Sequence, residues 1–169
     1  KSVGQVTDEE MEEMIRAAIK GPGVCQGIGT ANTMHIACEA LGFCLPGTTP
    51  VLANSPAMWD AVKAASHRIV EMVDEDLKPR DILTPEAFAN CVKTLLAVSG
   101  SLNAMKHLQA IAHAAQSDVD VFGLFDKYAD DIPLLAGIRP NGDIFIDDFD
   151  AAGGTLAVMV ACYPKLAKS

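Results

Sequence analysis

Basic residues, aromatic residues and long uncharged apolar runs are all scarce in this chain of 169 residues. Lys and Arg number 13 against 22 Asp and Glu, which gives a formal net charge of −9. That charge repels phosphate backbones, and no Lys/Arg cluster interleaved with aromatic residues offsets it, so the composition argues against nucleic-acid binding. No stretch is long and apolar enough to cross a bilayer, and no basic-then-apolar signal segment opens the chain. We therefore expect a protein of the cytoplasm or of an organelle matrix, without a membrane partner.

The cysteines fit a disulfide scaffold poorly, because their number is odd and their spacing irregular. The five positions are Cys25, Cys38, Cys44, Cys91 and Cys162. We expect reduced thiols. Cys38 and Cys91 fall on apolar helix faces, where a small buried hydrophobic side chain is the ordinary role, while Cys44 and Cys162 carry no clear signal.

Half of the residues are hydrophobic (50%), which is enough for one ordinary domain with a core. We expect residues 1–169 to form a single domain. The chain begins with Lys1 rather than Met, which indicates a piece of a larger protein.

Helix signals dominate the pattern. Thr7-Asp-Glu-Glu10 has the form of a capping box, and the pairs Ser55-Pro56 and Thr84-Pro85 place proline in the first turn of a helix. Apolar residues at helical spacing follow each start and also run through residues 34–41, 105–112 and 124–132. A last helical run follows Gly153-Gly154 and stops near Pro164. Ser101 can cap the helix that contains residues 105–112. The pattern predicts a predominantly α-helical segment with few short strands.

The best strand candidate is Asp143–Ile146, which follows the turn signal Pro140-Asn-Gly142. The acidic run around it lacks the alternation and the glycine of an EF-hand loop, so we interpret it as solvated charge at a helix start. Its members are Asp143, Asp147, Asp148 and Asp150.

The glycine-rich segment GPGVCQGIGTANTM at residues 21–34 joins two predicted helices. Backbone amides and the dipole of the following helix can bind an anion there, but neither a P-loop nor a dinucleotide-binding fingerprint is complete. Cys25 stands among these glycines ahead of a helix N-terminus, in an environment that favours thiolate. That environment suits a nucleophile or a metal ligand. A third interpretation, that Cys25 is a loop cysteine with no functional role, stays open as well.

A nucleophilic Cys25 would need a histidine base, and the sequence does not single one out. The candidates are His35, His67, His107 and His113. His35 and Glu39 lie one helical turn apart, which favours a surface pair over a metal site.

Residues 25–48, CQGIGTANTMHIACEALGFCLPGT, resemble the cysteine motif of the dihydroxy-acid dehydratase family, which includes phosphogluconate and sugar-acid dehydratases. Gly-x-Cys-x-Gly, Thr-Ala-Asn-x-Met, Glu-Ala-Leu-Gly and Pro-Gly follow one another in the family's order. The later stretches LKPRDILTPEAFAN, SGSLNAMKHLQAIAHAA and DIFIDDFDAAGG are also similar to family segments. The resemblance extends from about Thr7 to Val160.

The resemblance implies an α/β domain of three α/β/α layers and a hydro-lyase, a small-molecule enzyme that forms a homo-oligomer when complete. Such enzymes remove water from a 2,3-dihydroxy acid, either a branched-chain precursor or a sugar acid, to give a 2-keto acid. Three cysteines hold a [2Fe-2S] or [4Fe-4S] cluster whose open iron acts as a Lewis acid. Mg²⁺ binds the substrate, and a serine removes the proton.

Of these family residues, Cys25 alone matches an iron ligand of the cluster. Ser101 and Asn103 fall where the family has Gly-Gly-Ser-Thr-Asn, which makes them candidate substrate-binding residues, although this chain reads SGSLN at residues 99–103. The Cys-Asp-Lys segment, the third cysteine, a later glutamate and the serine base are missing. We expect the second half of a dehydratase N-terminal domain, inactive alone and without catalytic residues of its own. The alternative is a non-catalytic helical binding or interaction module that keeps this scaffold.

Overall fold

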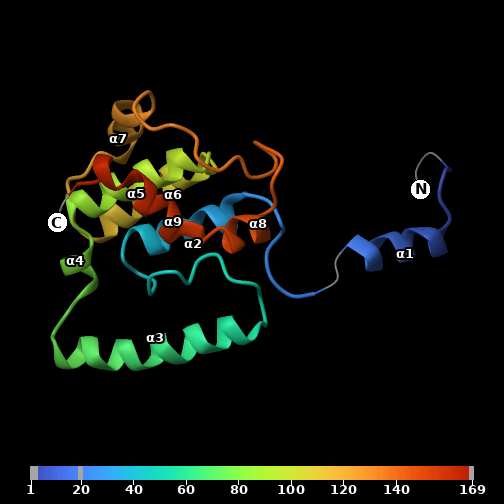
Figure 1. Ribbon diagram of the computed structural model, residues 1–169, viewed down its shortest axis with the longest axis horizontal. Helices are drawn as coiled ribbons and strands as arrows, with labels where there is room; N and C mark the ends of the chain where they lie inside the picture. The colour runs from blue at the N-terminus through green and yellow to red at the C-terminus, as the bar shows by residue number, and fades with distance from the viewer. Residues whose placement is uncertain (1–3, 19–20, 168–169) are drawn as a thin grey trace.

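The computed structural model describes residues 4–18 and 21–167, so Lys1, and the inference drawn from it, lies outside the described residues. Helices make up nearly all of the regular structure (Figure 1). In chain order they are α1 (Asp8–Ala18), α2 (Thr30–Ala40), α3 (Pro56–Asp74), α4 (Pro79–Ile82), α5 (Pro85–Ala97), α6 (Asn103–Ala114), α7 (Val121–Tyr128), α8 (Ile146–Ala151), α9 (Gly154–Cys162) and the 3₁₀ helix η1 (Tyr163–Lys165). The predicted predominantly helical segment is confirmed.

The three predicted helix starts are confirmed by their caps. Thr7 and Glu10 exchange hydrogen bonds, the Thr7 amide donating to the Glu10 carboxylate (2.8 Å) and the Glu10 amide to the Thr7 hydroxyl (3.2 Å). The hydroxyls of Ser55 and Thr84 each accept a backbone amide from three residues further on, at 3.1 and 3.2 Å. These are local interactions, which is why the sequence alone predicts them.

The predicted strand at Asp143–Ile146 is wrong. Within the described residues, β structure is limited to one isolated bridge between Ile138 and Ile144. A strand needs a partner along its length, and here the chain turns into α8 as the Asp148 carboxylate accepts the Phe145 amide at 2.9 Å. The four aspartates of the acidic run are exposed around this helix start, as predicted.

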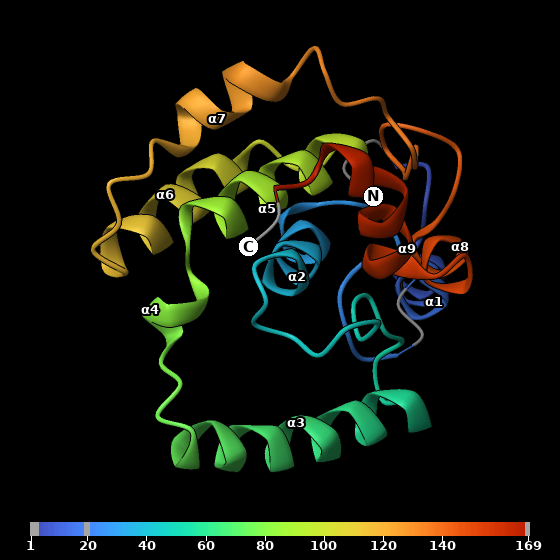
Figure 2. The same ribbon diagram turned by 60° about the vertical axis from the view of Figure 1, so that its left-hand side comes forward.

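The core lies where α2 and α5 cross and are covered by α6, α7 and α9 (Figures 1 and 2). α5 supplies its central residues: Phe88, Cys91, Val92 and Leu95 are buried as the helical spacing predicts. α2 faces them with Ile36. The loop that precedes α2 is thereby attached to the most buried part of the fold.

α1 and α3 stand apart from this core. α3 runs along the side of the molecule opposite α7, and α1 extends away from the body (Figures 1 and 2). None of the described residues of α1 or α3 is buried. The apolar stripe expected on α3 is exposed, from Trp59 (57%) through Val62, Ile69 and Val70 to Val73 (75%).

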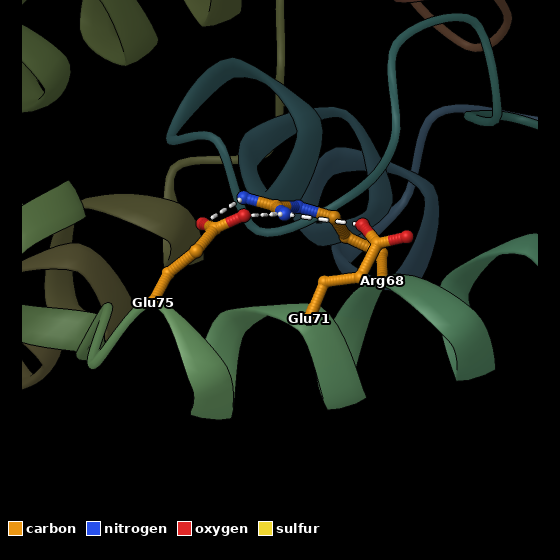
Figure 3. A network of polar contacts seen from close by, with 3 residues as sticks. All are labelled: Arg68, Glu71 and Glu75. Atoms are coloured by element: carbon orange, nitrogen blue, oxygen red, sulfur yellow. Dashed lines mark hydrogen bonds and ion pairs between the residues drawn. The ribbon is translucent and has the colours of Figure 1, made fainter.

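The half-buried residues of α3 lie on another side of the helix, at Met58, Ala61, Arg68 and Met72. There Arg68 pairs with the carboxylates of Glu71 and Glu75 near the end of the same helix (Figure 3). Its contact with Glu75 is bidentate, with an Nη1–Oε1 distance of 2.6 Å and an Nη2–Oε2 distance of 2.8 Å. Hydrogen bonds from Arg68 lower the pKa of Glu75. The side of α3 nearest the body is therefore occupied by an ion-pair network, and its apolar stripe faces elsewhere.

Among the described residues, no helix is both long enough and apolar enough to cross a bilayer.

Candidate functional site

Cys25 is exposed on a loop whose shape is determined by the residues around it. Its thiol contacts the Gly27 carbonyl (Sγ–O 3.8 Å). The side-chain amide of Asn32, which is only 2% exposed, donates to the carbonyls of Cys25 (2.8 Å) and Gly27 (2.7 Å). One buried side chain from the first turn of α2 thus holds both ends of the cysteine turn, so this is a positioned loop and not a free one.

A second segment holds the loop from the other side. The Ile28 amide donates to the Arg139 carbonyl (2.7 Å), and the Ile146 amide donates to the Gln26 carbonyl (2.8 Å). At Gly27 an added Cβ would lie 2.8 Å from the Arg139 carbonyl oxygen. Glycine is therefore required at this position by the close approach of the two backbones.

Ser101 and Asn103 lie at the first turn of α2, beside the end of the cysteine loop. The Ser101 and Thr30 hydroxyls are hydrogen-bonded at 3.1 Å, and the side-chain amide of Asn103 donates to the Thr30 hydroxyl (2.9 Å). The Ser101 backbone amide donates to the Thr33 hydroxyl (2.9 Å). The structure therefore brings the predicted substrate-binding residues to the helix that begins after Cys25. Residue 102 takes the cap position of α6, and Ser101 assists by accepting the Asn103 amide at 3.3 Å.

Three positioning residues of this site escaped the sequence reasoning: Asn32, Thr30 and Thr33. All three belong to the Thr-Ala-Asn-x-Met motif, so the motif itself was the available signal. Its spacing gave no indication of their partners, because Thr30 and Ser101 are 71 residues apart in the chain.

The predicted surface pair of His35 and Glu39 is wrong. His35 is exposed, but Glu39 is 6% exposed and accepts three hydrogen bonds from the following turn. The donors are the Gly47 amide (2.6 Å), the Thr49 amide (2.8 Å) and the Thr49 hydroxyl (2.7 Å). Chain reversal after α2 brings these donors to Glu39, an arrangement that helical spacing cannot reveal.

All five cysteines lie in the described part of the chain and are free thiols. Cys91 is fully buried, as predicted, and burial raises the pKa of its thiol. Cys162 is buried as well. Cys38 is only half-buried, contrary to expectation, because helical spacing shows which face a residue shares but not how completely other elements cover it.

An iron–sulfur cluster would find one ligand in this loop. Cys25 offers an exposed thiol on a loop fixed by Asn32, which suits a cluster ligand. Over residues 4–18 and 21–167, no group of three or more His, Cys, Asp or Glu side chains could hold a metal ion. The described residues therefore fit part of a cluster site and do not complete one.

Comparison with known proteins places the whole segment in one family. The family model described as the dihydroxy-acid/6-phosphogluconate dehydratase N-terminal domain matches residues 1–167. The chain is 42% identical over 156 residues to the dihydroxy-acid dehydratase of Syntrophotalea carbinolica, covering 92% of this chain and 28% of that protein. For the Methanococcus maripaludis enzyme the identity is 40% over 164 residues, covering 97% and 30%.

The chloroplastic dihydroxy-acid dehydratase of Arabidopsis thaliana is 36% identical over 156 residues, which cover 92% of this chain and 26% of the relative. The chain thus spans less than a third of the length of these relatives. By the extent of the family match, the chain belongs to the dihydroxy-acid/6-phosphogluconate dehydratase N-terminal family.

Proposed function

We propose that this chain is part of a hydro-lyase that removes water from a 2,3-dihydroxy acid, a branched-chain precursor or a sugar acid, to give a 2-keto acid. Relatives named dihydroxy-acid dehydratase match nearly all of it. The observation that carries the proposal is the cysteine loop. Asn32 and the backbone of residues 139–146 hold Cys25 in place, next to the turn that contains Ser101 and Asn103.

Cys25 is the proposed iron ligand. Thiolates hold iron–sulfur clusters, and amides near the sulfur stabilise the charge of the bound form. When bound, the cluster supplies a Lewis-acidic iron for the departing hydroxyl. The other ligands, and the carboxylates for Mg²⁺, would come from the rest of the dehydratase chain, because the described residues do not provide them.

Ser101 and Asn103 are the proposed substrate-binding residues. Their hydroxyl and amide groups are held by Thr30 at the N-terminal end of α2. The partial positive charge of that helix end favours a carboxylate, which every substrate of this class carries.

The exposed helices support the view that the chain is one partial domain of a longer enzyme. Large apolar side chains on α3, such as Trp59 and Val73, face neither α2 nor α5. In the proposal, residues 1–169 belong to a three-layer α/β/α domain, and the remainder of the chain covers this stripe. The complete enzyme would act as a homo-oligomer in the cytoplasm or an organelle matrix.

The same stripe is the observation that favours the second candidate, a non-catalytic helical interaction module. The extent of the reading frame that encodes this chain distinguishes the enzyme proposal from the interaction-module proposal. A Cys-Asp-Lys segment upstream in one continuous frame supports the enzyme, and a frame confined to this chain supports the module.

Reconstitution with iron and sulfide tests the enzyme proposal. The isolated chain should bind less than one cluster per molecule and show no dehydratase activity, and a stoichiometric cluster with turnover would contradict this. In the complete enzyme, Cys25→Ser should abolish the cluster absorbance and the turnover. The matched control Cys44→Ser should retain both, since Cys44 lies beyond the other end of α2. A fully active Cys25→Ser enzyme would refute the ligand assignment.

A further inference from the structure

Two cysteines meet where α2 ends. Gly42 takes the left-handed conformation (φ +88°), its amide donates to the Glu39 carbonyl (2.9 Å), and the Phe43 amide donates to the Cys38 carbonyl (2.8 Å). This pair of bonds is a Schellman motif, which reverses the chain over the last turn of the helix. Cys44 is the next residue, and its thiol donates a hydrogen bond to the Cys38 sulfur.

The turn that carries Cys44 is also fixed by hydrogen bonds from the residues that follow it. Glu39 accepts the amides of Gly47 and Thr49, so the chain is fixed to α2 on both sides of Cys44. Both sulfur-bearing residues are half-buried, which leaves them within reach of small molecules. The two thiols are therefore kept in contact by the backbone and remain accessible.

The protonation states of Cys38 and Cys44 suit a pair in which one sulfur reacts with an oxidant and the other then forms the disulfide. The hydrogen bond from Cys44 lowers the pKa of Cys38 to about 7, although burial opposes it. The same bond, burial, and the charges of Cys38 and Glu39 raise the pKa of Cys44. Cys91 also faces Cys38, but it is buried and protonated. A thiolate next to a thiol is the arrangement that disulfide formation requires.

We propose that Cys38 and Cys44 are a modification site that forms a reversible disulfide when hydrogen peroxide oxidises the protein. The Cys38 thiolate attacks one peroxide oxygen, the O–O bond breaks, and the departing hydroxide takes a proton to become water. The sulfenic acid left on Cys38 is attacked by the Cys44 sulfur. An S–S bond forms, the S–O bond breaks, and that oxygen leaves as a second water with the Cys44 proton. Two thiols lose two electrons and one peroxide gains them.

This site is separate from the proposed cluster ligand. Cys25 precedes the N-terminal end of α2, whereas Cys38 and Cys44 flank its C-terminal end. The inference therefore holds or fails independently of the dehydratase proposal.

Peptide mapping tests the disulfide directly. The chain is treated with a small excess of hydrogen peroxide, alkylated in denaturant and digested with Glu-C, which cuts after Glu39 and so separates Cys38 from Cys44. A linked pair of peptides that dithiothreitol separates is the expected result. Cys25→Ser should still give the linked pair, and Cys44→Ala should give none. Unlinked peptides 14–39 and 40–71, with oxidation localised by fragmentation to Cys25 and not to Cys38, would overturn the proposal.

Alkylation rates supply a second measurement that does not depend on oxidation. At pH 7 about half of Cys38 is thiolate, against about 1% for a thiol at the ordinary pKa of 9.0. A thiolate of lower basicity is also a weaker nucleophile, which offsets part of this advantage. We therefore expect iodoacetamide to alkylate Cys38 about fivefold faster in the unsubstituted protein than in Cys44→Ala. Circular dichroism verifies that the variant is folded. Equal rates in the two folded proteins would show that Cys44 does not activate Cys38 and would refute the pairing.

Discussion

Replacing Glu39 removes the acceptor that ties the end of α2 to the following turn. In Glu39→Ala the Thr49 amide, which is buried, loses its partner at a cost of about 1–3 kcal/mol. The Gly47 amide lies in an exposed residue and can bind water, so its loss is closer to the net value of one bond, about 1 kcal/mol. The Thr49 hydroxyl keeps its contact with Thr155 (3.0 Å). We expect the free energy of unfolding to fall by about 3 kcal/mol.

Glu39→Gln tests the same reasoning more finely. One side-chain oxygen of the glutamine still accepts hydrogen bonds, but its NH₂ group faces another donor and cannot bond to it. We therefore expect the free energy of unfolding to fall by about 1–2 kcal/mol. Urea unfolding followed by circular dichroism measures both variants against Glu86→Ala. Glu86 is exposed in the first turn of α5, so its removal should change stability by less than about 0.5 kcal/mol.

Two results would refute this account of Glu39. One is a loss below about 1 kcal/mol for Glu39→Ala, which would mean that water replaces the carboxylate at no cost. The other is a gain in stability for Glu39→Gln. That gain would mean that the cost of burying a carboxylate exceeds the value of its three hydrogen bonds.

Three further perturbations have defined outcomes. Gly27→Ala should lower the free energy of unfolding by about 1–3 kcal/mol in urea titrations, because its Cβ would lie 2.8 Å from a carbonyl oxygen. Gly21→Ala, with nothing within 4 Å, is the control, and equal effects would contradict the packing argument. Asn32→Ala should cost about 2 kcal/mol and speed amide hydrogen exchange in residues 25–28, whereas unchanged exchange would show that other contacts hold the loop. Because the thiolate is the reactive form and its pKa is lowered, Cys38 alkylation should rise with pH around a midpoint near 7, and a midpoint near 9 would contradict the thiol contact.

Much of the helical structure could be predicted because its signals act over three or four residues. Thr84 and the proline after it mark the start of α5, and the spacing of Phe88 and Leu95 identifies its buried face. The same reasoning failed at residues 143–146, where a short apolar run after a turn signal resembles a strand. Strand formation depends on a partner from elsewhere in the chain, and the described residues supply one bridging position.

Burial also separated what could be predicted from what could not. Helical spacing identified an apolar stripe on α3 but could not say whether anything covers it, and Trp59 and Val73 proved exposed. It likewise placed Glu39 one turn from His35 without revealing the donors that bury it. Amphipathic spacing reports which residues share a face, and packing partners decide what that face meets.

The sequence by itself determined the cysteine loop, the order of the family motifs and the helix that follows Cys25, because each depends on residues close together in the chain. Only the tertiary structure decided which of these features meet. Ser101 joins Thr30 across 71 positions, and the segment at Arg139 closes over Gly27. Such contacts form when the core brings distant helices together, and a linear pattern carries no measure of that distance.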